Sequence, residues 1–332
     1  MNAWRRGEGK DFRLQIADFR FQDAPGEVIR SGTSGRKSEI RNLKSEIQGL
    51  AWTSPWWLGF LLLTAGPLAL SFYLSLCDYP LLASPVYIGA ENYRRLVEDP
   101  LWWQSLGNTV RFAVISIPLC SAFALLLAVL LKQPVRGIGV FRAVIFLPTI
   151  VPLIASAMVW LWMLNGRLGL INHALSWVGI DGPNWLGDPA WAMGGLVLIA
   201  LWSVGNTVII YLAGLQDIPF ELYEAAELDG AGALITFFRI TLPVLTPVIL
   251  FNAVIAIIAT FQYFVQPFAI WTASDRGGPG RSVYFYTWYL YDNAFQYLKM
   301  GYASAMAWVQ LVIILALTGL VFLVGRRVGY RP

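Results

Sequence analysis

Four carboxylates lie within nine residues of this chain, between two long apolar runs. They belong to Glu221, Glu224, Glu227 and Asp229, and Gly230 follows directly. Clustered carboxylates with no histidine or cysteine among them favour charged contacts with another surface over nucleophilic chemistry. We therefore expect the segment to lie in water, where it either docks on another protein or forms a solvated connection.

The residues around these carboxylates predict a helix, a turn and a second short helix. Pro219 suits the start of a helix, and Glu221 and Glu224 are favoured by the helix dipole near that end. Gly230 permits a sharp turn, and Pro243 marks the start of the next apolar run. The element would carry an acidic surface over an apolar underside. The underside residues are Leu222, Ala225, Ala226, Ile235 and Phe238.

The side-chain inventory does not favour an enzyme. The chain has one histidine, His173, in a polar connection, and no metal-ligand cluster or nucleophile–base pair. The two cysteines, Cys77 and Cys120, lie in or beside apolar runs, as small buried hydrophobic residues do. A phosphate-binding loop of the form G-x-x-x-x-G-K-[ST] is absent, so we expect no ATP binding by this chain. We predict neither catalytic residues nor a metal site.

Composition identifies the elements that must position the acidic segment. Of 332 residues, 57% are hydrophobic and 13% charged, whereas soluble domains carry about 25% charged residues. The apolar residues form runs close to the roughly 20 residues that a helix needs to cross a bilayer. The chain is therefore predicted to be an all-α, polytopic membrane protein with six spans. The expected spans are 56–77, 107–131, 141–164, 191–214, 244–266 and 303–324.

Basic residues predict the orientation of these spans, because Lys and Arg are enriched in cytoplasmic loops. The short connection at 132–142 contains Lys132, Arg136 and Arg142, and Arg326 and Arg327 follow the last span. Both termini are therefore expected in the cytoplasm, together with the acidic segment within the loop at 215–243.

Two regions differ in composition. Residues 1–50 are polar and of mixed charge, and we expect a poorly ordered tail there. A repeat at 37–40 and 44–47 would allow a short helix on a membrane or partner surface, but a dispensable tail is also open. Residues 51–332 form the predicted membrane domain.

Polar side chains within the spans are costly in lipid and so are candidates for a solute path. Neutral amides, hydroxyls and aromatic rings suit a polyhydroxylated solute, although hydrogen bonds between helices would use the same groups. The fourth and fifth predicted spans, 191–214 and 244–266, also contain the polar residues Ser203, Asn252, Thr260 and Gln266. The candidates for the path are Trp202, Asn206, Thr207, Gln262 and Tyr263.

The acidic segment also matches a longer motif. Glu224-Ala225-Ala226 is followed after three residues by Gly230, and after nine more by Ile240-Thr241-Leu242-Pro243. This spacing resembles the EAA motif of binding-protein-dependent ABC importer permeases. Phe141-Arg142 with Phe146-Leu147-Pro148, and Gly277-Gly278-Pro279 before the last span, resemble the sugar-permease branch, maltose-type and glycerol-phosphate-type. The resemblance covers about residues 50–328.

The resemblance implies a type I importer permease in the cell membrane that works by alternating access. Two permease subunits, in this branch usually different chains, would form the path, and two cytoplasmic ATPase subunits would use the ATP. An extracytoplasmic binding protein would deliver a sugar-like solute, with no cofactor or nucleic acid involved. A coupling helix within about 221–235 would dock on the ATPase through Glu224. The coupling residues implied are Glu221, Glu224, Ala225, Ala226, Asp229 and Gly230.

Two other functions stay open. An importer for a phosphorylated polyol or another small solute would have the same architecture, but the spans carry no visible Arg/Lys cluster for a phosphate. A secondary transporter belongs to a different class. It usually needs an ionisable relay within the membrane, and the central spans contain no carboxylate.

Overall fold

The computed structural model describes residues 49–271 and 275–327. The chain divides into two compact units, residues 1–65 and 66–332. In the first unit the described residues, 49–65, are helical. The predicted tail falls outside the described residues apart from its last two positions, so its order and its limit at residue 50 remain predictions.

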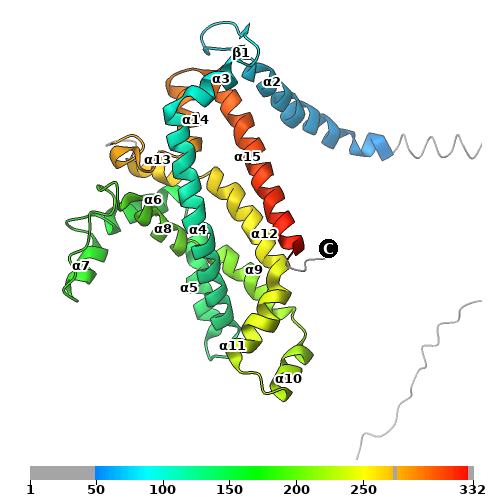
Figure 1. The fold of residues 1–332 in the computed structure, drawn as a ribbon, viewed down its shortest axis with the longest axis vertical. Helices are drawn as coiled ribbons and strands as arrows, with labels where there is room; N and C mark the ends of the chain where they lie inside the picture. The colour runs from blue at the N-terminus through cyan, green and yellow to red at the C-terminus, as the bar shows by residue number, and fades with distance from the viewer. Residues whose placement is uncertain (1–48, 272–274, 328–332) are drawn as a thin grey trace, which may run out of the picture. The chain divides into compact units, whose positions relative to one another are not determined.

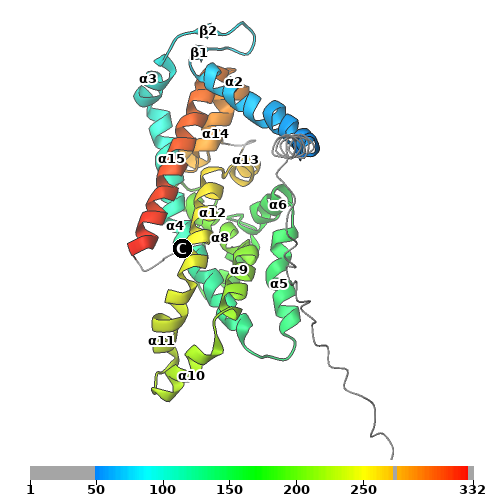
Figure 2. The same cartoon turned by 90° about the vertical axis from the view of Figure 1, so that its right-hand side faces the viewer.

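The second unit consists of helices and one small hairpin. The elements in chain order, with η1 from the first unit, are η1 (Leu61–Ala65), α2 (Gly66–Ser75), β1 (Cys77–Asp78), β2 (Val86–Tyr87), α3 (Glu91–Glu98), α4 (Pro100–Lys132), α5 (Ile138–Ile150), α6 (Leu153–Met163), α7 (Leu170–Ser176), α8 (Ala192–Trp202), α9 (Gly205–Gln216), α10 (Phe220–Leu228), α11 (Ala233–Thr236), η2 (Phe237–Thr241), α12 (Leu242–Phe261), α13 (Val265–Trp271), η3 (Pro279–Arg281), α14 (Tyr286–Tyr291), η4 (Asp292–Gln296) and α15 (Met300–Arg327). The hairpin and α10 lie at opposite ends of this unit (Figures 1 and 2).

Six membrane spans account for the long apolar helices. In the described part of the chain, four continuous helices are long and apolar enough to cross a bilayer: Gly49–Ser75, Pro100–Lys132, Ala233–Trp271 and Met300–Gly325. Two bent pairs, α5 with α6 and α8 with α9, complete six spans if each pair counts as one. The runs 141–164 and 191–214 are each predicted as one span, and in the structure each consists of two helices joined at a bend.

A proline accompanies the first break, and a close helix contact at a glycine follows the second. Between α5 and α6 the axis turns by 102° at Val151 and Pro152. Val151 is extended, at φ −70° and ψ 127°, because a following proline disfavours the helical conformation. The bend between α8 and α9 is 48° and falls at Ser203 and Val204. Gly205 is the first residue of α9 and packs closely on α5. A Cβ at this position would lie 2.6 Å from the carbonyl oxygen of Ile145.

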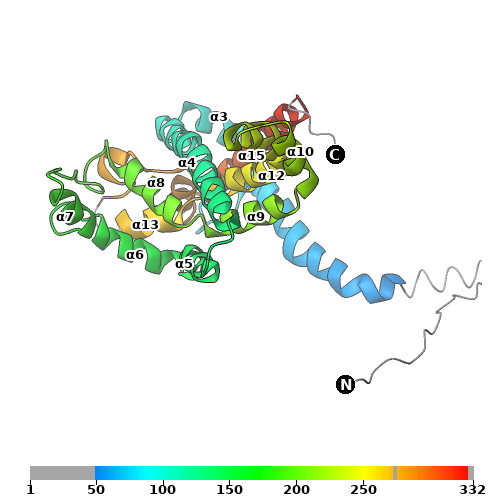
Figure 3. The same cartoon turned by 90° about the horizontal axis from the view of Figure 1, so that it is seen from below.

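The long helices pack directly on one another. The helix α12 contacts both α4 and α15, and α9 packs along α4 (Figure 1). Ala124 and Ala128 of α4 are fully buried in one apolar cluster with Val208 and Leu215 of α9. Small residues let helix backbones approach closely in a bilayer, where van der Waals packing replaces much of the hydrophobic effect. The helix α7 lies at the edge of this unit in Figures 1 and 3.

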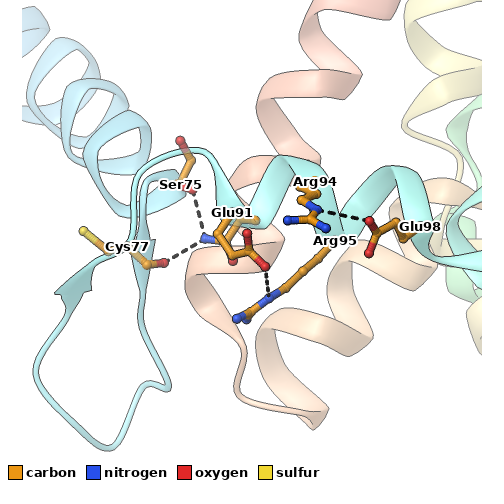
Figure 4. A network of polar contacts seen from close by, with 7 residues as sticks. Ser75, Cys77, Glu91, Arg94, Arg95 and Glu98 are labelled. Atoms are coloured by element: carbon orange, nitrogen blue, oxygen red, sulfur yellow. Dashed lines mark hydrogen bonds and ion pairs between the residues drawn. The ribbon is translucent and has the colours of Figure 1, made fainter.

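Polar contacts fix the end of the unit that carries the hairpin. The Asn92 amide of α3 donates to the carbonyl oxygens of Ser75 at 2.9 Å and Cys77 at 2.8 Å. Figure 4 shows this junction beside two ion pairs within α3, Arg94–Glu98 and Arg95–Glu91. Both pairs are solvent-exposed, and such pairs contribute at most about 0.5 kcal/mol each. The buried amide therefore holds the hairpin to α3.

Two carboxylates bind tyrosine hydroxyls near the same end. Asp99 is half-buried and caps α4 by accepting from the Leu101 amide at 2.9 Å. It also accepts from the hydroxyls of Tyr289 and, at 2.8 Å, Tyr302. Asp292 is fully buried and accepts from the hydroxyl of Tyr284 at 2.6 Å. Tyr289 and Tyr302 thus join the start of α4 to α14 and α15, and Tyr284 joins the segment before α14 to η4.

Candidate functional site

The acidic segment folds as a short helix, a turn and a second short helix. Pro219 is the N-cap of α10, one position before the helix, and Asp229 is its C-cap. Gly230 follows in the left-handed conformation, at φ +74°, with no atom within 4 Å of where a Cβ would lie. Glycine is therefore favoured at this position by the backbone angle and not by a lack of space for a side chain, because other residues rarely adopt positive φ. The chain then turns into α11.

The structure places the predicted coupling residues on one exposed element. Glu221, Glu224, Ala225, Asp229 and Gly230 are all exposed, so their surface is available to a partner. Ala226 differs, because it is 6% exposed and packs inside the unit. No described atom forms a hydrogen bond or ion pair with the carboxylates of α10.

Large apolar side chains are exposed beside these carboxylates. Leu228 at the end of α10 is 90% exposed, Leu234 of α11 is 75% exposed and Phe238 of η2 is 61% exposed. Exposed apolar groups gathered beside charges mark interaction sites in soluble regions. Acidic side chains and exposed leucines therefore occur together on α10 and α11, which lie at one end of the unit in Figure 2.

Tyr223 links α10 to the spans, and sequence reasoning did not single it out. Its hydroxyl lies 3.2 Å from the Thr241 hydroxyl and 3.4 Å from the Lys132 ammonium nitrogen. The Lys132 nitrogen also lies 4.6 Å from the centre of the Tyr223 ring. One feature of the sequence could have indicated Tyr223: its hydroxyl is the polar group on the face of α10 that is otherwise apolar.

A second candidate site is a cavity between the spans. It has a volume of about 250 Å³ and is lined by α4, α6, α8, α9, α12 and α13. Both helix breaks reach it, because Leu153 begins α6 and Ser203 ends α8. Interrupted helices beside a cavity are a recurrent feature of transporter binding sites. The polar lining residues are Ser116, Ser121, Ser203, Thr207, Tyr211, Asn252, Thr260, Tyr263 and Gln266.

Some of these polar side chains form hydrogen bonds within the protein, and others form none in the described part of the chain. The hydroxyl of Tyr211 lies 2.6 Å from that of Ser121, and the Asn252 amide donates to the Val248 carbonyl at 3.0 Å. Within the described residues, Thr207, Thr260 and Gln266 make no side-chain hydrogen bond. The hydroxyl of Tyr263 is buried without a partner in that same part of the chain, while its ring stacks on Phe112 at 4.8 Å.

The five predicted path residues do not all meet at this cavity. Thr207 and Tyr263 line it, whereas Trp202, Asn206 and Gln262 are not among its lining residues. Trp202 packs edge-on against Trp160, with ring centres 5.9 Å apart. Asn206 and Gln262 are exposed on the surface of the single chain. Their role in a solute path therefore stays a prediction.

The sequence prediction did not include the contribution of α4. Ser116 and Ser121 lie in the cavity wall, as does Tyr211 of α9. Serines in an apolar helix are common packing residues, and their spacing along α4 does not reveal which neighbour they face. The pairing of Ser121 with Tyr211 requires the packing of α4 on α9, which the sequence alone does not specify.

Neither site contains the groups expected of an enzyme. No cluster of three or more metal-ligating side chains occurs in the described residues. The side chains that line the cavity between the spans are uncharged. What the arrangement provides is hydrogen bonding and ring contacts inside the membrane domain, and an exposed acidic and apolar surface at one end.

Comparison with known proteins decides the family. Residues 120–330 match the family described as "Binding-protein-dependent transport system inner membrane component". This match covers more than half of the chain. The chain belongs to this family. It is a membrane-embedded transport permease, and its long apolar helices agree with this.

Individual relatives and a solved structure agree with this placement. The permease is 38% identical to the "Probable ABC transporter permease protein YesP" of Bacillus subtilis over 88% of its own length and 94% of that protein. It is 34% identical to the trehalose/maltose transport system permease protein MalF of Thermococcus litoralis, over 78% and 87% of the two chains. A chain of a bacterial ABC transporter that imports the acidic polysaccharide alginate has the same fold. That comparison has a TM-score of 0.72 at 21% identity and covers 88% of this permease and 100% of that chain.

Proposed function

We propose that this permease is one half of the path of an ATP-driven importer for a neutral sugar or related polyol. The observation that carries the proposal is the uncharged polar lining of the cavity between the spans. The free hydroxyls of Thr207, Thr260 and Tyr263 and the amide of Gln266 suit the hydroxyls of a sugar, and the Tyr263 and Phe112 rings suit its C–H faces. Relatives whose names include a sugar, such as the trehalose/maltose permease of Thermococcus litoralis, support the same solute class.

The partners follow from the family and from the exposed surface of α10. In this proposal, an extracytoplasmic binding protein delivers the solute and a second permease subunit completes the path. Two cytoplasmic ABC ATPases close on ATP, one of them binding α10 of this chain, while the permease itself needs no cofactor. Glu224 provides the acidic contact, Glu221 and Asp229 flank it, and the helix sits in an ATPase cleft. Rigid-body closure of the ATPases then rocks the spans around the cavity.

Transport by the reconstituted complex tests the proposal. The complex of this permease, the second permease subunit and the ATPase would be reconstituted in liposomes that contain ATP. Labelled solutes and the binding protein would be added on the side opposite the ATP. We expect ATP-dependent uptake of a neutral sugar and none of a phosphorylated polyol. Uptake of the phosphorylated polyol alone would move the solute assignment to that class. Uptake driven by an ion gradient without the ATPase would overturn the importer mechanism in favour of a secondary transporter.

The coupling role of α10 has its own test. Glu224→Lys reverses one exposed charge on α10, whereas Glu98→Lys reverses an exposed charge on α3 at the other end of the unit. We expect Glu224→Lys to insert into the membrane normally but to lose ATPase association and transport. Glu98→Lys should retain both. Wild-type transport by Glu224→Lys would remove Glu224 from the coupling contact.

A further inference from the structure

The helix α10 is attached to the spans through one polar side chain. Among the residues that the structure describes, Tyr223 is the only α10 residue whose side chain forms a hydrogen bond. Its side chain is half-buried, in contrast to the exposed carboxylates of Glu221 and Glu224. The helix therefore has two functional faces, a free acidic face and a face held by Tyr223.

Lys132 holds Tyr223 from the side of α4 and α9. It is the last residue of α4, and its ammonium group donates to the Leu215 carbonyl oxygen at 2.9 Å. Leu215 lies in the last turn of α9, where carbonyl groups lack helical partners and the dipole favours a cation. The same ammonium group faces the Tyr223 ring at 4.6 Å. A single cation thus joins the ends of α4 and α9 to α10.

Thr241 holds the same tyrosine from the side of α12. Its hydroxyl lies 3.2 Å from the Tyr223 hydroxyl, and the Thr241 side chain is buried. Thr241 ends η2, which continues without interruption into α12. Tyr223 therefore contacts the end of α4 and the start of α12 directly, and the end of α9 through Lys132. The other attachments of α10 are the apolar packing of Ala226 and of the Tyr223 ring, and its backbone connections, one of which contains Gly230.

We propose that Lys132 is a positioning residue which, with Tyr223 and Thr241, fixes the coupling helix to α4, α9 and α12 and transmits its movement to them. The inference rests on the proposed docking of α10 on an ATPase. A helix held only by its backbone connections would pivot at Gly230 when the ATPase moves. With the linkage intact, the same movement displaces the ends of three spans that line the cavity.

Efficiency of coupling is the property that this linkage controls. The acidic docking face is free of the linkage, so ATPase binding and ATP hydrolysis should survive its removal. The number of solute molecules transported per ATP hydrolysed should fall. A structural defect alone would lower both activities together, so the ratio separates the two explanations.

Substitution of Lys132 in the complete complex tests the proposal. Lys132→Met keeps the aliphatic stem but removes the cation, whereas Lys132→Arg can still bind the carbonyl and stack on the ring. We expect Lys132→Met to assemble with the ATPase and to transport at least about fivefold less solute per ATP, the lower end of typical coupling effects. Lys132→Arg should recover most of the loss. Arg136→Met removes a nearby exposed charge that has no partner in the described residues, and it should match the wild type.

A second pair of variants tests the link to α12. Tyr223→Phe and Thr241→Val each remove one hydroxyl of the same contact with little change in volume. Each should lower the transport per ATP. The double variant should be no worse than Tyr223→Phe, because Thr241→Val removes only a contact that Tyr223→Phe has already deleted. Additive effects, or wild-type ratios in both singles, would overturn this part of the linkage.

The outcomes separate this inference from the proposed function. If the wild-type complex shows no ATP-driven uptake, the proposed function itself fails. If the wild type transports and Lys132→Met has the same ratio, the linkage fails while the importer stands. Loss of ATPase binding in Lys132→Met would also overturn the linkage, because it would place Lys132 in the docking surface.

Discussion

Two tyrosines in the cavity between the spans differ in one respect. The Tyr211 hydroxyl has a partner, Ser121, at 2.6 Å, whereas the Tyr263 hydroxyl is buried and unpartnered within the described chain. A buried hydroxyl without a partner costs free energy, and a protein retains one where a ligand satisfies it. At the scale of single residues, this contrast distinguishes a packing group from a candidate solute contact.

Removal of each hydroxyl should therefore have a different effect. Tyr211→Phe should lower the free energy of unfolding by about 1 kcal/mol, the typical net value of a hydrogen bond. Tyr263→Phe should leave the stability unchanged or raise it, but weaken solute transport by increasing KM. Thermal unfolding in detergent and uptake kinetics would measure the two effects. A loss of stability in Tyr263→Phe with normal uptake would assign that hydroxyl to structure.

The buried carboxylate of Asp292 gives a prediction about pH. Burial raises the pKa of Asp292, and the bond from Tyr284 and the Arg276 guanidinium at 3.7 Å offset only part of this effect. The folded state then binds the proton more tightly than the unfolded state. The stability contributed by Asp292 is therefore greatest below its ordinary pKa of about 4. It decreases as pH rises through the folded-state pKa.

Asp292→Asn should abolish this part of the pH dependence. The amide oxygen can still accept from Tyr284, but the group no longer titrates. We expect the difference in unfolding temperature between Asp292→Asn and the wild type to grow in favour of the variant as pH rises from about 4. Asp275→Asn, which removes an exposed carboxylate nearby, serves as the control. Equal pH profiles for the two variants would contradict the burial argument.

At the scale of elements, the contact between α9 and α5 depends on one glycine. A methyl group at Gly205 would lie 2.6 Å from a backbone carbonyl of α5, which cannot move aside as a flexible side chain does. Gly194 of α8 offers a matched position, because no atom lies within 4 Å of its Cβ site.

We expect Gly205→Ala to lower the free energy of unfolding by about 1–3 kcal/mol, as overpacking does. Gly194→Ala should be neutral or stabilising, since alanine favours a helix. Thermal unfolding of both variants in the same detergent would measure the difference. If Gly205→Ala were as stable as Gly194→Ala, the close approach of α9 to α5 would be wrong.

The positions of the apolar helices could be predicted from the sequence, but the breaks in two of them could not. Hydrophobic runs determine where a helix can cross a bilayer, and each predicted run overlaps one span. Pro148 lies inside α5 without ending it, whereas Pro152 ends a helix with a 102° bend. The same residue type gives different outcomes because neighbouring helices decide whether the freed carbonyl groups find partners.

Of the two candidate sites, the local sequence pattern predicted α10 and its turn, but it did not predict the residues that line the cavity. The turn at Gly230 follows from residues adjacent in sequence, and the structure shows its positive φ. The cavity joins Ser116 to Tyr263 and Gln266, which are far apart in the chain. Which polar residue of a span faces inward depends on helix rotation, and nearly uniform hydrophobicity around each span conceals that rotation.

At the scale of the whole molecule, the predicted orientation puts α10 and α7 on opposite sides of the membrane. Leu228 of α10 and Trp177, which follows α7, are both exposed and suit labelling through an introduced cysteine. Cys77 and Cys120 would first be replaced. We expect a membrane-impermeant maleimide to label Leu228→Cys only in inverted vesicles and Trp177→Cys only in right-side-out vesicles. Labelling of both from one side would refute the predicted orientation.

The exposed leucines of α10 and α11 have a consequence for the life of the protein in the cell. Leu228 and Leu234 are exposed in the single chain, where quality-control proteases recognise uncovered apolar segments. If the proposed ATPase covers these leucines, a permease synthesised in excess of it would be degraded faster than an assembled one. Degradation of orphan chains would match the number of permeases to the number of ATPases without any transcriptional control.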